Sequence, residues 1–184
     1  MGKGLDIGCG RNKSAGCVGM DRVALDGVDV VHDVNVAPWP FPDNEFSLVR
    51  MSHVIEHCDS ILVTMEEAHR VLRDGGIVEI VTPHYTDPVS WQDVTHKWHL
   101  NSRSFDYFDP GYHTNYYTKA RFEIVDSYIQ VSNLFKPLGA EFLVNLERKH
   151  RFWRFFRKQW ELYLCFLVRG KSMSFKLKAI KPAA

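Results

Sequence analysis

The stretch Leu5-Asp6-Ile7-Gly8-Cys9-Gly10 decides the fold that we predict for this chain. It begins as a short apolar run, carries one acid and then turns into glycine. Glycine has no Cβ atom and tolerates positive φ, so a strand ending in such a turn brings bare backbone close to a ligand. A second run, Val18-Gly19-Met20-Asp21, ends in an acid that suits the hydroxyls of a ribose. Together the two runs predict a nucleoside pocket.

Length, charge and cysteine content limit the classes of protein to which the chain can belong. The 184 residues suit one domain (1–184) with a hydrophobic core. The net charge of +1 gives no argument for nucleic acid, and we expect none as a partner. The four cysteines show no zinc-type spacing, and no secretory signal precedes them, so we expect free thiols in a cytoplasmic protein. No apolar run approaches the ~18 residues of a membrane span.

Hydrophobic patterning predicts an α/β protein with a mostly parallel sheet. We expect strands at 4–8, 17–21, 28–33, 46–51, 77–82, 122–131 and 174–180. A helix is expected at 59–73, capped by Asp59 or Ser60 and stopped by Gly75-Gly76. The link between the first two strands is too short for a full crossover helix. That helix is therefore expected to be a single turn or absent.

The glycine turn does not match two common phosphate-binding motifs. Lys13 stands where a dinucleotide fingerprint has its third glycine, and Asp21 follows Gly10 by eleven positions, whereas that fingerprint places its acid ~20 residues on. The pair Lys13-Ser14 also lacks the spacing of a Walker loop. A single nucleoside fits the acids better than a dinucleotide.

Four motifs in order resemble a known family. Residues 5–10 resemble motif I of class I S-adenosylmethionine-dependent methyltransferases. Residues 39–49 resemble the "lPFpDnsFDlV" segment of the type 11 branch, with Ser47 in place of its usual Asp. Residues 52–57 resemble "shvlEH", and residues 67–76 resemble "E-x-x-RVLkpGG". The resemblance is close over residues 4–84.

The resemblance implies a Rossmann-like sheet of about seven strands, mostly parallel, with helices on both faces. Relative to the family we expect truncation at the N-terminus, a lid insertion after strand five and a helical insertion before the last strand. Residues 1–84 would form the cofactor-binding half, 85–121 the acceptor-side lid, and 122–184 the last strands with an aromatic basic helix.

The implied reaction is transfer of the methyl group of S-adenosylmethionine, leaving S-adenosylhomocysteine. The acceptor would be a small molecule or a lipid- or glycan-linked compound. The alternative is a catalytically inactive methyltransferase-fold protein that binds cofactor or a partner. A homodimer is compatible with either reading.

The resemblance assigns cofactor binding to residues at or near strand ends. They are Asp6, Gly8, Cys9, Gly10, Asp21, Arg22, Asp33, Val34, Ser52 and His53. The glycine turn would contact the methionine part and ribose, Asp21 the ribose hydroxyls, 33–34 the adenine and 52–53 the sulfonium side. For Asp6 and Asp33, stabilisation of a local turn is the alternative.

The segment 84–99, rich in His and Trp, follows the fifth strand and is placed to bind the acceptor. His96 and His84 are the candidate general bases, because an oxygen or nitrogen acceptor must lose a proton. The expected acceptor-binding residues are Tyr85, Asp93, Trp98 and His99. The alternative is a polar-aromatic lid without chemistry. We assign no metal site, although His84, Asp87, His96 and His99 have suitable ligand types.

Residues 138–166 are expected to be helical, with aromatic and basic residues interleaved. One stripe would be apolar, formed by Phe142, Leu146, Trp153, Phe156, Trp160, Tyr163 and Leu167. The simplest interpretation is a lid helix with a solvated basic face. The functional interpretation is an interfacial helix that makes peripheral membrane contact through 142–167.

Overall fold

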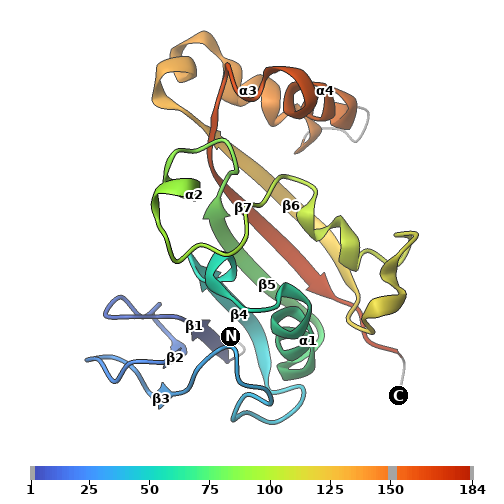
Figure 1. Ribbon diagram of the computed structural model, residues 1–184. Helices are drawn as coiled ribbons and strands as arrows, with labels where there is room; N and C mark the ends of the chain where they lie inside the picture. The colour runs from blue at the N-terminus through green and yellow to red at the C-terminus, as the bar shows by residue number, and fades with distance from the viewer. Residues whose placement is uncertain (1–2, 149–152, 183–184) are drawn as a thin grey trace.

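The structure, a computed structural model, describes residues 3–148 and 153–182. It forms one seven-stranded sheet in the order β3-β2-β1-β4-β5-β7-β6 (Figure 1). The strands are β1 (Gly4–Ile7), β2 (Cys17–Asp21), β3 (Val30–Val31), β4 (Phe46–Ser52), β5 (Leu72–Pro83), β6 (Phe122–Val131) and β7 (Gly170–Ala179). The first five pair in parallel, and β7 pairs antiparallel with β5 and β6. The predicted Rossmann-like α/β class is confirmed. The expectation of helices on both faces is wrong for the described residues, because the face that carries Glu79 and Lys176 stays partly exposed.

The helices are short. The α-helices are α1 (Ile61–Val71), α2 (Val89–Gln92), α3 (Ala140–Val144) and α4 (Arg154–Gln159). The 3₁₀ turns are η1 (Ile55–His57), η2 (Ser104–Phe108), η3 (Asn115–Tyr117), η4 (Asn133–Leu138) and η5 (Leu146–Arg148), and η7 (Trp160–Leu164) is π-helical. Within the described residues, no helix combines the length and apolar character needed to cross a bilayer.

The link from β1 to β2 contains no helix, in agreement with the short crossover predicted. The loop is held instead by side chains of the sheet. The backbone N–H of Ser14 donates to Asp6 Oδ2 over 2.7 Å, and Arg50 Nη1 donates to Ser14 Oγ over 2.6 Å. The short link between parallel β1 and β2 is stable here because buried Asp6 on β1 holds the loop at Ser14.

Helix α1 covers β4 and β5 (Figure 1). Ser60 caps it, since its Oγ accepts from Val63 N over 3.3 Å. Met65, Ala68 and Val71 fall on its buried face. The predicted stop at Gly75-Gly76 is wrong, because the chain turns extended at Leu72 and β5 begins there by pairing with Phe46.

The opposite face of the sheet carries a row of charges. Asp6, Arg50, Glu79, Lys176 and Asp126 are register neighbours on β1, β4, β5, β7 and β6. Their signs alternate along the row, and Lys176 Nζ lies 2.7 Å from Glu79 Oε1. Side chains alternate between the two faces along a strand, so the residues before and after each of these charges point to the apolar core. Opposite charges on adjacent strands stabilise this face.

Residues 133–148 and 153–168 form a cap at the top of the sheet in Figure 1. The single helix predicted over 138–166 is wrong, because this segment is broken into η4, α3, η5, α4 and η7. Gly139 takes φ 73°, a left-handed conformation that interrupts the helix two residues after Pro137. Residues 149–152, which lie between Leu146 and Trp153 of the predicted apolar stripe, are outside the described part of the chain.

The cap protects the free edge of β6. Asn145 Oδ1 accepts from Ile129 N over 2.8 Å, and its Nδ2 donates to Ile129 O over 2.7 Å. Buried Arg157 donates from Nη1 to Ser127 Oγ and from Nη2 to Asn145 Oδ1. An unpaired strand edge would otherwise present backbone groups without partners.

Candidate functional site

The glycine turn lies at the carboxyl edge of β1. Gly8 and Gly10 take φ of 62° and 51°, values that residues with a Cβ atom rarely adopt. The N–H of Gly8 donates to Met20 O over 2.8 Å. A Cβ added to Gly8 would stand 2.5 Å from Val54 Cγ2, whereas one added to Gly10 would meet open space. The turn is therefore packed on one side and open to a ligand on the other.

Asp21 stands at the tip of β2, next to this turn. Ile7 is the register neighbour of both Met20 and Met51, so the positions that follow them, Gly8, Asp21 and Ser52, come together at one edge. Asp21 Oδ2 accepts from Gly10 N over 2.9 Å, and Oδ1 accepts from Val23 N over 3.0 Å. These bonds aim the carboxylate and leave lone pairs for ligand hydroxyls. The described residues thus fit S-adenosylmethionine.

The other predicted cofactor residues surround this edge. Asp6 anchors the loop through Ser14, and Asp33 Oδ1 accepts from Asn35 N over 2.9 Å in a local turn. Both contacts match the turn-stabilising alternative. Cys9 is buried, and burial raises the pKa of its thiol. Arg22 is exposed, and Val34 packs against the core.

His53 follows β4 in a strained backbone conformation. Its φ is 56°, and its N–H donates to Val81 O over 2.8 Å. Its Nδ1 lies 3.2 Å from Glu56 Oε1, and this contact raises the pKa of His53. Glu56 itself is buried, and its Oε2 accepts from Thr82 Oγ1 over 3.0 Å. Sequence reasoning did not single out Glu56, although it lies within the motif at 52–57.

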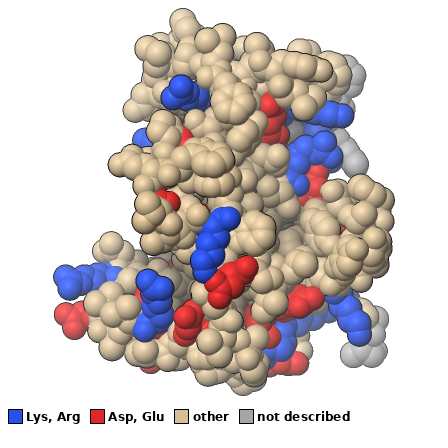
Figure 2. All heavy atoms as spheres, in the orientation of Figure 1, with Lys and Arg blue, Asp and Glu red and all other residues tan. Residues whose placement is uncertain are grey.

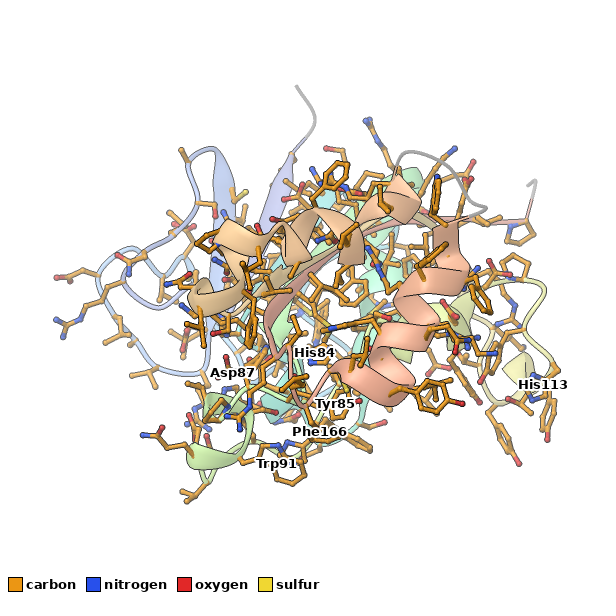
Figure 3. All side chains as sticks on the ribbon, turned by 90° about the horizontal axis from the view of Figure 1, so that it is seen from above. His84, Tyr85, Asp87, Trp91, His113 and Phe166 are labelled. Atoms are coloured by element: carbon orange, nitrogen blue, oxygen red, sulfur yellow. The ribbon has the colours of Figure 1, made fainter. Side chains whose placement is uncertain are left out.

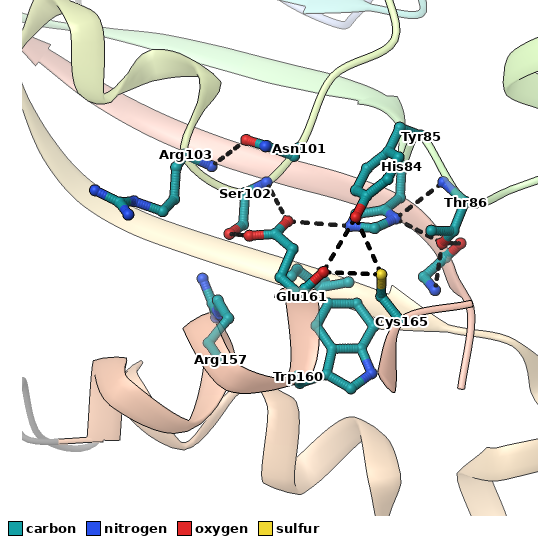
Figure 4. Close-up of polar contacts among 12 residues, drawn as sticks. His84, Tyr85, Thr86, Asn101, Ser102, Arg103, Arg157, Trp160, Glu161 and Cys165 are labelled. Carbon is teal, nitrogen blue, oxygen red and sulfur yellow. Dashed lines mark hydrogen bonds and ion pairs between the residues drawn. The ribbon is translucent and has the colours of Figure 1, made fainter. Parts of the chain in front are cut away.

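His84 is a buried hydrogen-bonding centre (Figure 4). Its Nδ1 lies 2.7 Å from Thr86 Oγ1, and its Nε2 lies 3.2 Å from Glu161 Oε1. Glu161 also accepts from the N–H and hydroxyl of Ser102. Both ring nitrogens of His84 are therefore engaged with protein groups, and its ring is closed to solvent. This geometry argues against His84 as a general base and favours a structural role.

His96 lies beside His57 near the carboxyl end of β4. The two ring centroids are 4.6 Å apart, and His96 Nδ1 lies 3.0 Å from Ser90 O. Asp93 Oδ2 is 3.8 Å from His96 Nε2, so this predicted acceptor-binding residue lies beside the candidate base. Hydrogen bonds from Thr95 lower the pKa of Asp93. The contact between the rings of His96 and His57 was not predicted from the sequence.

Two of the predicted acceptor residues, Tyr85 and His99, belong to a partly exposed aromatic group with Trp91 and Phe166. Figure 3 shows Tyr85, Trp91 and Phe166 gathered on one side of the molecule. Trp91 Nε1 donates to Tyr85 O over 2.7 Å, and the rings of Tyr85 and Phe166 lie 5.8 Å apart. His99 stacks on Trp91 at 3.5 Å, and Trp98 Nε1 donates to Cys58 O. Burial raises the pKa of the Tyr85 hydroxyl, so it stays protonated.

A separate groove of about 810 Å³ lies between the 102–112 segment, β6 and α4. Its charged lining includes Arg103, Arg154 and Asp106, which are already paired with one another. None of the predicted site residues lines it. The groove is therefore distinct from the edge formed by β1, β2 and β4.

Comparison with known proteins decides the family. A family model described as a methyltransferase domain matches residues 1–126, more than half of the chain. The chain belongs to this methyltransferase family. The predicted recognition as a class I S-adenosylmethionine-dependent methyltransferase is confirmed, and with it the enzyme class and the cofactor. No curated protein matches the chain.

Solved structures share the fold of this methyltransferase at low sequence identity. An S-adenosylmethionine-dependent methyltransferase from Archaeoglobus fulgidus is 18% identical with TM-score 0.56, covering 96% of this chain and 86% of its own. One from Mesorhizobium loti is 13% identical with TM-score 0.57, covering 96% and 90%. The [4+2]-cyclase SpnF is 16% identical with TM-score 0.56, covering 98% and 76%. The fold alone therefore does not fix the reaction.

Proposed function

We propose that this methyltransferase acts on an apolar, lipid-linked acceptor that reaches the site from the cap formed by 133–148 and 153–168. The observation that carries this proposal is the apolar surface of the cap. Eleven of its described large apolar side chains are exposed: Leu134, Leu138, Phe142, Leu143, Phe155, Phe156, Leu162, Tyr163, Leu164, Phe166 and Leu167. Soluble monomers seldom gather so many on one segment without a partner surface.

The charge distribution supports the same acceptor. Figure 2 shows few charged side chains over the upper part of the molecule, where the cap lies. Among the basic residues of the cap, Arg148 pairs with Asp126 and Arg154 with Asp106, whereas Lys158 is exposed and suited to a phosphate group. Aromatic side chains beside basic ones are typical of segments that lie in a lipid–water interface.

The cap is connected to the predicted transfer site through the lid. Tyr85 donates to Glu161 O over 3.2 Å, and its ring contacts Phe166 of the cap. On the other side, the N–H groups of Lys97 and Trp98 donate to Glu56 O, next to the carboxyl end of β4. An acceptor bound against the cap would therefore have its head group near the methyl donor. The donor supplies the methyl group, and these residues would position the acceptor.

The test uses methyl-tritiated S-adenosylmethionine with a lipid extract and, separately, an aqueous metabolite extract of the source organism. We expect the label to partition into the chloroform phase. Label confined to water-soluble products would contradict a lipid-linked acceptor.

A second measurement tests the surface itself. The double variant Leu162→Asp/Leu167→Asp should reduce co-sedimentation with anionic phosphatidylglycerol vesicles, whereas Val63→Asp on α1 should not. Val63 is a matched control because it is an exposed aliphatic residue outside the cap. Equal co-sedimentation of the wild type and the cap variant would show that the cap is not a membrane-contacting surface.

A further inference from the structure

A cluster of potential metal ligands lies beside the predicted methyl-donor site. Glu56, His57 and His96 each offer one ligand atom, and these three atoms lie within 4.8 Å of one another. Ligand atoms held at about 2.1 Å from a common ion can be up to about 4.2 Å apart, so small side-chain rotations would close this set around a cation. The alternative set of His84, Asp87, His96 and His99 does not come together as a ligand group among the described residues. Both ring nitrogens of His84 are engaged by Thr86 and Glu161.

The backbone builds this cluster from two distant segments. Glu56 and His57 belong to η1, directly after β4. The carbonyl of Glu56 accepts from both Lys97 N and Trp98 N, at 2.8 and 3.2 Å. These bonds hold the 93–98 segment against η1 and bring His96 to His57. The cluster is therefore a product of the fold and not of two mobile surface side chains.

Hydrogen bonds fix the protonation of both histidine rings. Thr95 Oγ1 donates its one proton to Asp93 Oδ1 over 2.6 Å, so it must accept from His57 Nδ1 at 3.0 Å. His96 Nδ1 lies 3.0 Å from Ser90 O, a carbonyl that can only accept. These contacts favour the tautomer with the proton on Nδ1 in both rings, which leaves the lone pair on Nε2; in His96 this atom lies 3.8 Å from Asp93 Oδ2. Metal-binding histidines are oriented by a second partner in this way.

The carboxylate of the cluster lacks a strong counter-charge. Glu56 is 1% exposed, and within the described part of the chain its ion-pair partner is His53, not a Lys or Arg side chain. Because a histidine partner is charged only when it is protonated, a divalent cation would supply the permanent positive charge that this buried carboxylate otherwise lacks. Thr82 and His53 orient its two oxygens, which matches the second contacts usual for metal-ligating carboxylates.

We infer that Glu56, His57 and His96 bind one divalent transition-metal cation, which recruits a hydroxyl group of the methyl acceptor. Two imidazoles and a carboxylate leave coordination positions open to an oxygen ligand. The cation would lower the pKa of the hydroxyl, whose proton leaves to solvent. The oxygen then forms a bond to the methyl carbon, the carbon–sulfur bond breaks, and its electron pair remains on sulfur. This inference specifies the acceptor atom and rests on the proposed methyl transfer.

The position of the cluster suits this task. Val54, two residues before Glu56, packs against Gly8 of the glycine turn. His53, which precedes Val54, is predicted to face the sulfonium. The cation would therefore lie next to the methyl donor and on the lid side, where the acceptor enters.

Metal binding can be measured without any acceptor. Tag-free protein stripped with EDTA is titrated with Mn²⁺, followed by loss of the free-ion electron paramagnetic resonance signal, and with Co²⁺ by calorimetry. We expect about one ion per chain. His96→Asn and Glu56→Gln should each weaken binding at least tenfold, whereas His113→Asn should not. His113 lies far from Tyr85 and Trp91 in Figure 3 and is the matched control.

Thermal unfolding of the metal-free variants separates lost binding from lost folding. His96→Asn provides the decisive comparison if Glu56→Gln does not fold. Lack of Mn²⁺ and Co²⁺ binding by folded wild-type protein, or equal binding by wild type and His96→Asn, would overturn the inference.

Activity gives a second readout. EDTA should abolish labelling of the acceptor and Mn²⁺ should restore it, with the label recovered as a methyl ether. Full labelling after chelation would overturn the role of the cation. Ion binding without any methyl transfer would contradict the proposed function while leaving the metal site intact, so the two failures can be told apart.

Discussion

His84 Nε2 lies 3.2 Å from Glu161 Oε1 although 77 residues separate them in the chain. The contact joins the end of β5 to the cap, and Ser102 of the lid donates to the same carboxylate. Three segments that surround the predicted acceptor site therefore meet at one buried carboxylate. The His84–Glu161 contact fixes how the cap sits on the sheet.

Glu161→Gln should lower the free energy of unfolding at pH 7 by about 1–3 kcal/mol, because charge-assisted hydrogen bonds are lost. Burial alone would raise the pKa of Glu161, but the hydrogen bonds from His84 and Ser102 outweigh it and lower the pKa. A carboxylate with a lowered folded-state pKa stabilises the protein above its unfolded pKa. That contribution is lost as pH falls through the folded pKa.

Urea unfolding at pH 7 and pH 3 measures this effect. The wild type should lose more stability on acidification than Glu161→Gln does. Glu66→Gln, on the exposed side of α1, serves as control and should follow the wild type. Parallel pH dependences of wild type and Glu161→Gln would show that the carboxylate is not stabilised by its partners.

Gly8→Ala should cost more stability than Gly10→Ala. Both positions have positive φ, which costs an alanine about 1–2 kcal/mol. Only at Gly8 does the added Cβ also meet Val54, at 2.5 Å. Chemical denaturation gives both values, and adding Val54→Ala should recover part of the loss at Gly8. Equal losses at the two glycines would refute the close packing of the turn on Val54.

Lys176→Glu should destabilise the charged face of the sheet by about 1 kcal/mol, because it places like charges beside Glu79 and Asp126. The effect should shrink in 1 M salt, where exposed charges are screened. Lys171→Glu, exposed at the start of the same strand, is the control. Thermal unfolding at low and high salt gives the comparison. A salt-independent loss would point to packing instead of charge.

The sequence predicted the sheet well because its strands are apolar runs bounded by turn residues. The bounds of β2 and β6 agree with the prediction, and the missing helix after β1 was foreseen from the length of the link. At β3 the β-branched run 28–33 predicted a longer strand than the two residues observed. Asp33 and Asn35 turn the chain there, and local hydrogen bonds of this kind compete with strand pairing.

The cap and the lid could not be predicted in the same way, because tertiary contacts determine them. Helical spacing over 138–166 gave no sign that Arg157 would be buried against Ser127 and Asn145. His84 was assigned to catalysis because histidine suits a base, but its partner Glu161 is remote in sequence. The cluster of Glu56, His57 and His96 had one visible signal, the adjacent Glu-His pair after β4.

Calorimetric titration with S-adenosylmethionine tests most directly the central claim, a methyl-donor site at the edge shared by β1, β2 and β4. Wild-type protein should bind about one molecule per chain. Asp21→Ala should weaken binding at least tenfold, since hydrogen bonds to a charged acceptor contribute about 1.5–3 kcal/mol. Asp26→Ala, an exposed acid on the following loop, should bind as the wild type does. Lack of binding by the wild type, or unchanged binding by folded Asp21→Ala, would contradict the account.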